Sequence, residues 1–338
     1  MKNRILSCLL ACAPAWAEDS VALVGSYYYE YEARNTRVVH PMIEVKKDLP
    51  REAEVSAYFL VDQITSASAA FQGGDDSVYQ EYREEAGAAF RMRFGDVTPG
   101  ASIRASYEPD YESTSVGLES TFSLRQDTTI LQLLGKLQDD NVFDLGVNRD
   151  LDAYMAGAHL TQVVRKDLQV GLGLEGSLLQ GYQANPYRRC ASLEREIHPE
   201  RRRRLTAVGW GAWHARPTHT TLYAGYFFYD DSWAVRAHAA ELRVTQRVLP
   251  PLEVEAYWRP YTQTAAYFVG TEGSAGYCTG DPKLTAFEAH LVEGVLRVSL
   301  PPFWFLREPK IEGALGRLSQ GNRYRDAVLA RLGGSFAF

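Results

Sequence analysis

The sequence predicts an all-β fold: a transmembrane antiparallel β-barrel of about sixteen strands, preceded by a cleaved N-terminal signal peptide. Three observations support this prediction. The chain begins like a secretory signal, apolar and polar side chains alternate every second residue along most of its length, and the last residue is phenylalanine. No apolar run approaches the ~18–20 residues that a membrane-spanning helix needs.

The first residues have the parts of a secretory signal. A positively charged start precedes an apolar stretch at residues 5–13 and a small-x-small cleavage site at Ala15-Trp16-Ala17. We therefore expect residues 1–17 to be a signal peptide, and residues 18–338 to form a single barrel domain in the outer membrane of a Gram-negative bacterium. The stretch Leu9 to Cys12 also resembles a lipoprotein processing site, although the bulky Leu10 fits that alternative poorly.

The composition is compatible with two classes of exported protein. Hydrophobic residues make up 46% of the chain, with 20 tyrosines and 27 glycines, yet the mean hydropathy is only -0.27. A soluble all-β protein fits these values, and so does a barrel that hides its apolar residues by alternation. The strand count and the alternation of short and long connections favour the barrel. The net charge of -6 argues against nucleic acid as a partner.

The alternation is clearest between residues 83 and 96, where Ala86, Ala88, Phe90, Met92 and Phe94 share one face and charged or small residues share the other. Patterns of this kind predict strands at 21–33, 38–48, 53–64, 83–96, 100–111, 113–126, 129–138, 152–166, 168–180, 203–216, 219–229, 234–247, 252–267, 284–300, 310–319 and 326–338.

The predicted connections are alternately tight and long. Four long, polar segments, at 65–82, 138–152, 181–202 and 268–283, fall on one side of the predicted membrane span, which we expect to be extracellular. Barrels of about 16–18 strands enclose an aqueous channel.

The last strand resembles the signal that the outer-membrane assembly machinery recognises. Phe338 ends the chain, and counting back by twos gives Phe336, Gly334, Leu332 and Ala330, an apolar face. We expect Phe336 and Phe338 to act as this assembly signal, in a strand that closes the barrel against the first one.

Removal of the signal peptide leaves two of the four cysteines, Cys190 and Cys278. In an oxidising compartment such a pair predicts one disulfide, here between two long loops. The Cys/His clusters of a metal site are absent from the sequence, so no metal and no cofactor is predicted.

Four patches of the sequence resemble a bacterial family of outer-membrane barrels that is known only as a domain of unknown function. They are Asp62 to Ser68, Gly181 to Arg202, Tyr226 to Trp233 and Arg259 to Tyr267. Phe227 stands where the family usually has arginine, and Pro260 where it usually has tyrosine. The resemblance implies an outer-membrane barrel without an established activity. It also implies gene neighbours concerned with extracytoplasmic redox chemistry and flavin attachment.

The patches lie near the predicted extracellular strand ends, so their polar residues could meet at the mouth of the barrel. The candidate residues are Asp62, Arg188, Tyr229, Asp230, Asp231, Arg259, Tyr261 and Gln263. In the functional interpretation they form a charged constriction, with Asp62 facing Arg259 across the lumen, whose field selects solutes. In the alternative interpretation they are a salt-bridged loop plug that only orders the rim, because buried polar side chains in a barrel must be paired in any case.

The leading functional prediction is a porin-like channel for small polar solutes. Its wall charges are of mixed sign, which suits weak selectivity. The alternatives are a blocked barrel, serving as a surface scaffold or as the partner of a periplasmic redox system, and a barrel enzyme acting on lipid or lipopolysaccharide. Enzyme activity is not predicted, because no histidine lies in a nucleophile motif. His159 and His290 have lumen parity but are more simply wall residues.

Outer-membrane lipid and lipopolysaccharide are the expected surroundings of the barrel. The run Arg201 to Arg204 could hold lipopolysaccharide phosphates at the outer rim. The alternative is that this run is a solvated strand start.

Overall fold

The computed structural model describes residues 19–30, 36–66, 79–144, 147–185, 188, 190, 195–270, 276–322 and 326–338. The predicted signal peptide, residues 1–17, lies outside this range, as does most of the predicted loop at 65–82. In the part of the chain that the structure describes, no helix is long and apolar enough to cross a membrane.

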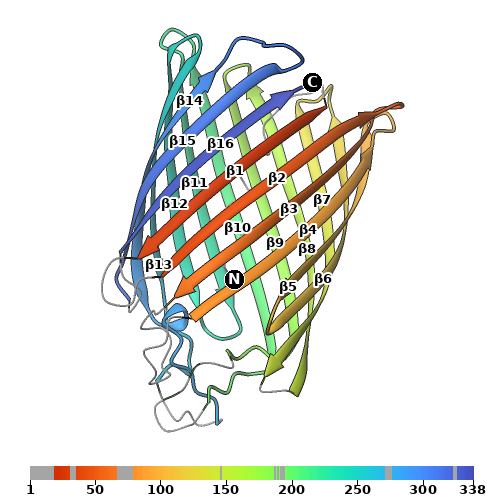
Figure 1. Cartoon of the computed structure of the whole chain (residues 1–338). Helices are drawn as coiled ribbons and strands as arrows, with labels where there is room; N and C mark the ends of the chain where they lie inside the picture. The colour runs from red at the N-terminus through yellow and green to blue at the C-terminus, as the bar shows by residue number, and fades with distance from the viewer. Residues whose placement is uncertain are drawn as a thin grey trace.

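Sixteen antiparallel strands form one closed barrel, in which each strand pairs with its sequence neighbours and β16 returns to pair with β1 (Figure 1). The strands are β1 Ser20–Glu30, β2 Arg37–Leu49, β3 Ala53–Ser66, β4 Tyr79–Met92, β5 Val97–Glu108, β6 Tyr111–Leu124, β7 Thr129–Asp144, β8 Val147–Arg165, β9 Leu168–Gly181, β10 Arg201–Ala215, β11 Thr220–Asp231, β12 Arg236–Leu249, β13 Leu252–Gln263, β14 Phe287–Ser299, β15 Arg307–Gln320 and β16 Ala327–Ala337. The predicted fold class is confirmed, and each predicted strand overlaps one of these.

The alternation in the sequence becomes an apolar outer face and a polar inner face. Leu118, Leu172 and Leu332 are each about two-thirds exposed on the outer face, where lipid takes the place of water. On the inner face, Glu85 and Arg104 form an ion pair with atoms 2.8 Å apart. Closure of the sheet leaves no unpaired strand edge in the hydrocarbon layer, which is the condition for a sheet to span a membrane.

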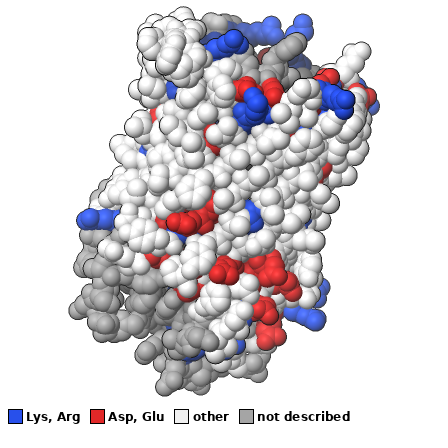
Figure 2. All heavy atoms as spheres, turned by 45° about the vertical axis from the view of Figure 1, so that its right-hand side comes forward, with Lys and Arg blue, Asp and Glu red and all other residues white. Residues whose placement is uncertain are grey.

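Outward positions become charged toward the end of the barrel that carries the long loops. Glu84, Asp139 and Asp152 are exposed there, and Asp139 is opposite Asp152 in the β7–β8 pair. The face shown in Figure 2 is mostly uncharged, and most of its acidic residues lie in the lower half, toward the loops. The acidic residues therefore mark one border of the lipid-facing band.

The two ends of the barrel differ in their connections. At the end that holds Ser20 and Ala337, most links are tight, such as residues 50–52 and 166–167. The opposite end holds the long connections, including residues 182–200 and 264–286 with the short 3₁₀ helix η2, Pro282–Leu284 (Figure 1). Short turns face the periplasm and long loops face the exterior in barrels of this class, so we call the loop end extracellular.

The predicted loop at 138–152 is wrong, because β7 and β8 continue through most of it as one tall hairpin. Asp140 pairs with Leu151 and Asp144 with Val147. Polar residues occupy both faces of this hairpin above the membrane, so the hydrophobic alternation that predicts strands stops while backbone pairing continues. At the end of β4 the strand is shorter than predicted. Residues 93–96, predicted to be strand, form a turn in which Gly95 has φ 60°.

The last strand closes the barrel as the sequence predicts. Val21 pairs with Phe336 and Ser20 with Ala337, and the Phe338 N–H donates a hydrogen bond to the Asp19 carbonyl at 2.9 Å. Its role as an assembly signal stays a prediction.

Deleting Phe336 to Phe338 should sharply reduce the membrane-inserted, heat-modifiable form, because the β1–β16 seam would lose its first pairs at the periplasmic end. The measurement is the fraction of unheated protein that migrates fast on a denaturing gel of isolated membranes. Trp304→Ala, which removes an aromatic side chain that is 88% exposed in a turn at the same end, is the control and should insert normally. Normal insertion of the deletion would contradict the assembly role.

Candidate functional site

Three extracellular connections fold together over the β9–β14 side of the mouth. We call them the loop cap: the described parts of residues 182–200, 232–235 and 264–286. Trp233, Val235, Ala266, Phe268 and Leu284 form its apolar core, in which the Phe268 ring meets the Trp233 ring edge-on at 5.1 Å. The cap is therefore a packed structure with a core of its own, built on the rim of the barrel.

Asp231, the last residue of β11, holds the base of the loop cap. Its Oδ1 accepts hydrogen bonds from the N–H groups of Trp233 and Val235 at 2.9 and 3.0 Å. Its Oδ2 accepts one from the Tyr229 hydroxyl at 2.7 Å and one from Arg202 Nε at 2.8 Å. The Asp231 side chain is fully buried, and the Arg202 guanidinium lies 4.0 Å from the centre of the Trp233 ring. These contacts explain why Tyr229, Asp231 and Trp233 occur at this spacing in the sequence.

A second buried carboxylate joins the two longer loops of the cap. Glu196 Oε1 accepts hydrogen bonds from the Thr279 hydroxyl at 3.0 Å and from the Gly280 N–H at 2.8 Å. Arg188 forms an ion pair with Asp281. At the end of β13, the Gln263 side chain donates to the carbonyls of Lys283 and Thr285 at 2.8 and 2.7 Å.

The predicted disulfide between Cys190 and Cys278 is confirmed: it joins these same loops across 88 residues of sequence, with Cα atoms 5.9 Å apart. Ile197 and Cys278 also exchange backbone hydrogen bonds of 3.0 and 2.9 Å. The two loops meet above the short β11–β12 connection, where the rings of His198 and Phe268 both lie against the Trp233 ring. The covalent bond fixes a contact that the backbone already makes.

Thiol labelling of the mature protein should find neither cysteine reactive until a reductant is added, because both side chains are buried as well as bonded. The double variant Cys190→Ser, Cys278→Ser should loosen the cap by about 2–4 kcal/mol, the usual contribution of a native disulfide, measured as faster proteolysis of the cap loops. Two thiols that react without reductant would contradict this prediction.

The predicted site residues separate into three groups. Arg188, Tyr229, Asp231 and Gln263 hold the loop cap, with the Tyr261 hydroxyl donating to Gln263 at 2.5 Å. Asp230 faces the outer side, where it pairs with Arg236 at 3.1 Å and its side chain is 42% exposed. Asp62 and Arg259, which we expected to face each other, each bind neighbours on their own side of the barrel.

Asp62 belongs to a network on the inner wall of β2 to β6. It contacts His40 and forms an ion pair with Arg83 at 2.7 Å. Further along the wall, Glu85 accepts hydrogen bonds from the Tyr58 hydroxyl and from Arg104, both at 2.8 Å. The interleaved signs along this wall agree with the mixed lining expected from the sequence.

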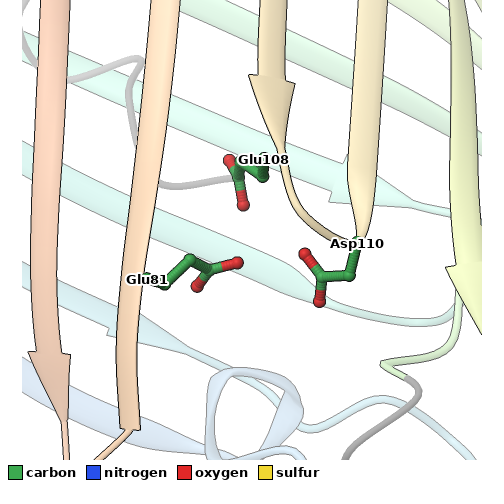
Figure 3. Close-up of side chains that lie close together, drawn as sticks. All are labelled: Glu81, Glu108 and Asp110. Atoms are coloured by element: carbon green, nitrogen blue, oxygen red, sulfur yellow. The ribbon is translucent and has the colours of Figure 1, made fainter.

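Sequence reasoning missed three carboxylates on the same side of the mouth, which we call the acidic trio: Glu81, Glu108 and Asp110. They come from the start of β4, the end of β5 and the tight β5–β6 turn, and one oxygen of each lies within 4.8 Å of the others. In Figure 3 their carboxylates point toward one another. Arg83 Nε lies 3.9 Å from a Glu108 oxygen, but the same guanidinium also pairs with Asp62. Three carboxylates this close favour a negative potential that attracts cations.

Arg259 belongs to a group on the inner wall of β12 and β13, which we call the arginine cluster: Arg259 itself with Glu241 and Arg243, two residues that sequence reasoning missed. Arg243 donates to Glu241 at 3.2 Å, and Arg259 Nε lies 3.9 Å from the same carboxylate. The cluster therefore has two cations for one anion. Arg259 lies over the ring of Phe227, 5.7 Å from its centre. Phe227 occupies the position where the resembling family usually has arginine.

His159 faces the lumen and binds Glu175 at 3.0 Å, whereas His290 is exposed on the outer face beside Trp258, so its predicted lumen parity is wrong. Arg201 and Arg203 are exposed while Arg202 is buried, so only alternate arginines of the run reach the outer surface. Their binding of lipopolysaccharide stays a prediction.

The comparisons with known proteins agree with this architecture. The model of a family described as "Protein of unknown function (DUF3570)" matches residues 147–290, which span β8 to the start of β14 and so contain the loop cap. The predicted family resemblance is confirmed over that stretch. No curated protein matches the sequence.

Three solved structures share the fold at very low sequence identity. A BenF-like porin from Pseudomonas fluorescens Pf-5 is 7% identical with a TM-score of 0.51, and the match covers 95% of this chain and 98% of that one. A bacterial polysaccharide outer membrane secretin is 7% identical with a TM-score of 0.56, covering 96% and 100%. CdiB from Acinetobacter baumannii is 8% identical with a TM-score of 0.58, covering 95% and 61%.

The apolar outer face, the closed sheet and the charged inner wall together give the chain a porin-like fold. The chain is an outer-membrane β-barrel of porin-like fold, and its residues 147–290 match a protein family of unknown function.

Proposed function

We propose that this protein is a channel for small polar solutes, with a charged constriction near its extracellular mouth. The observation that carries the proposal is the position of the two charged groups. The acidic trio lies on β4 to β6 and the arginine cluster on β12 and β13, about half of the sixteen-strand circuit apart. Opposite charges fixed on opposite walls produce a field across the lumen, which orients and sorts polar solutes.

The rest of the inner wall supports the same function. Its ionised groups are mostly paired along the strands, as in Arg297 with Glu255 and Glu312 at 3.0 and 2.6 Å. Paired charges of this kind are stable beside water in a lumen. A barrel of about sixteen strands is wide enough to enclose an aqueous channel. The loop cap rises from the β9–β14 side, so in this proposal it narrows the mouth from one side and solutes pass along the other.

The experiment is a swelling assay with proteoliposomes, in which small polar solutes should enter and large oligosaccharides should not. Two adjacent cysteine variants on β8 show whether the path is the lumen: Thr161→Cys on the inner face and Leu160→Cys, 40% exposed on the outer face. A bulky, charged thiol reagent should slow swelling only in the Thr161→Cys variant. No swelling with wild-type protein would favour the alternative of a blocked barrel, whose cap seals the mouth.

A further inference from the structure

The arginine cluster has an uncompensated positive charge that its neighbours do not neutralise. Glu241 already accepts a hydrogen bond from the Tyr257 hydroxyl at 3.0 Å as well as the one from Arg243. On the adjoining strands, Glu255 is bound by Arg297 and Glu293 by Arg331 at 3.3 Å. The carboxylates along this wall are therefore engaged, and Arg259 has only its 3.9 Å ion pair.

Arg259 also has hydrogen-bond donors that no protein acceptor uses. Within the described residues its guanidinium makes no hydrogen bond, although its side chain is only 20% exposed, and its Nε is buried without an acceptor. Arg243 has the same deficiency at Nε. Partly desolvated N–H groups without acceptors are costly in free energy. A carboxylate is the acceptor that matches a guanidinium best, because it can accept two parallel hydrogen bonds.

The wall around Arg259 is aromatic. Phe227, Ala239 and Tyr261 lie opposite one another on β11, β12 and β13, and the Tyr261 ring packs against Phe287 with centres 5.5 Å apart. Below them, Arg243 lies 4.9 and 5.3 Å from the centres of the Tyr223 and Tyr257 rings. Aromatic side chains offer ring edges and faces to a planar solute, and rings lie beside both guanidinium groups.

We infer that Arg259, with Arg243 beside it on the inner wall, binds the carboxylate of small aromatic acids as they cross the lumen. The ring of the bound acid lies against Phe227 and Tyr261. This inference rests on the proposed channel function and adds to it a class of solute. The site is one wall of the constriction, so a bound anion should lower the ion current without closing the barrel permanently.

The test is the effect of benzoate on ion current through wild-type protein in planar bilayers. Benzoate should reduce the current in a saturable way, cyclohexanecarboxylate should act more weakly, and neutral benzamide should have no effect. In Arg259→Gln the apparent affinity for benzoate should fall by at least about tenfold, because a charge-assisted bidentate contact is lost. Arg236→Gln removes the same charge on the outer face, where Arg236 pairs with Asp230, and should behave as wild type.

Different outcomes overturn different parts of the inference. Equal effects of benzoate and benzamide, or unchanged inhibition in Arg259→Gln, would overturn the carboxylate site while leaving the channel intact. Equal inhibition by cyclohexanecarboxylate would overturn the preference for a ring. If the wild-type protein conducts no current, the proposed function fails. Calorimetric titration of benzoate into detergent-solubilised wild type and Arg259→Gln then decides the site: binding lost in the variant supports it, and no binding overturns it.

Discussion

Asp231→Ala should destabilise the loop cap by about 3–5 kcal/mol, because it removes the partner of a buried arginine. Arg202 would be left with a buried charge, and the N–H groups of Trp233 and Val235 would lose their acceptor. The strands of the barrel should stay paired, since Asp231 is the last residue of β11. The measurement is the rate at which trypsin cleaves the cap, which should rise on the order of a hundredfold or more at ~1.4 kcal/mol per tenfold.

The neighbouring residue provides the matched control. Asp230→Ala removes the same carboxylate one position earlier, from an exposed ion pair with Arg236. Exposed pairs of this kind contribute ~0–1 kcal/mol, so cleavage of the cap should change little. Equal acceleration in both variants would show that Asp231 does not organise the cap.

Neutralising the acidic trio should change the ion selectivity of the channel. In the variant Glu81→Gln, Glu108→Gln, Asp110→Asn, three negative charges that lie within 4.8 Å of one another are removed. The permeability of potassium relative to chloride should then fall, by a factor on the order of ten, because the local cation concentration depends on this potential. The measurement is the zero-current potential in a salt gradient across a planar bilayer.

Three acidic residues on the outer face make the control for this experiment. Glu84→Gln, Asp139→Asn, Asp152→Asn removes the same charge from exposed positions at the same end of the barrel. This variant should keep the wild-type zero-current potential, because its charges face away from the lumen and are screened by salt. If the zero-current potential shifted as much as in the trio variant, ion selectivity would not depend on whether the carboxylates face the lumen.

The fold could be predicted from the sequence because lipid and lumen impose opposite demands on alternate residues. On β16, Leu332 is exposed on the outer face, whereas its neighbour Arg331 faces the lumen and forms an ion pair with Glu293. The same signal fails where both faces meet water, and the extension of β7 to Asp144 was therefore missed. The disulfide could be predicted because only two cysteines follow the predicted signal peptide.

The site could be predicted only in part, because side chains meet through register and loop packing rather than through sequence spacing. Asp231 and Gln263 are the last residues of β11 and β13, yet their partners, Arg202 and the carbonyl of Lys283, come from other elements. The acidic trio was missed for the same reason: Glu81 reaches Glu108 and Asp110 only through the pairing of β4 with β5.

Single-channel recording tests most directly whether the lumen is an open, water-filled path. Purified wild-type protein, confirmed as folded by its heat-modifiable migration and with its Cys190–Cys278 bond intact, is added to a planar bilayer in potassium chloride. We predict discrete, uniform current steps, with more cations than anions crossing in wild type and fewer once the acidic trio is neutralised. Folded, inserted protein that carries no current under these conditions would contradict the channel and identify a barrel sealed by its loop cap.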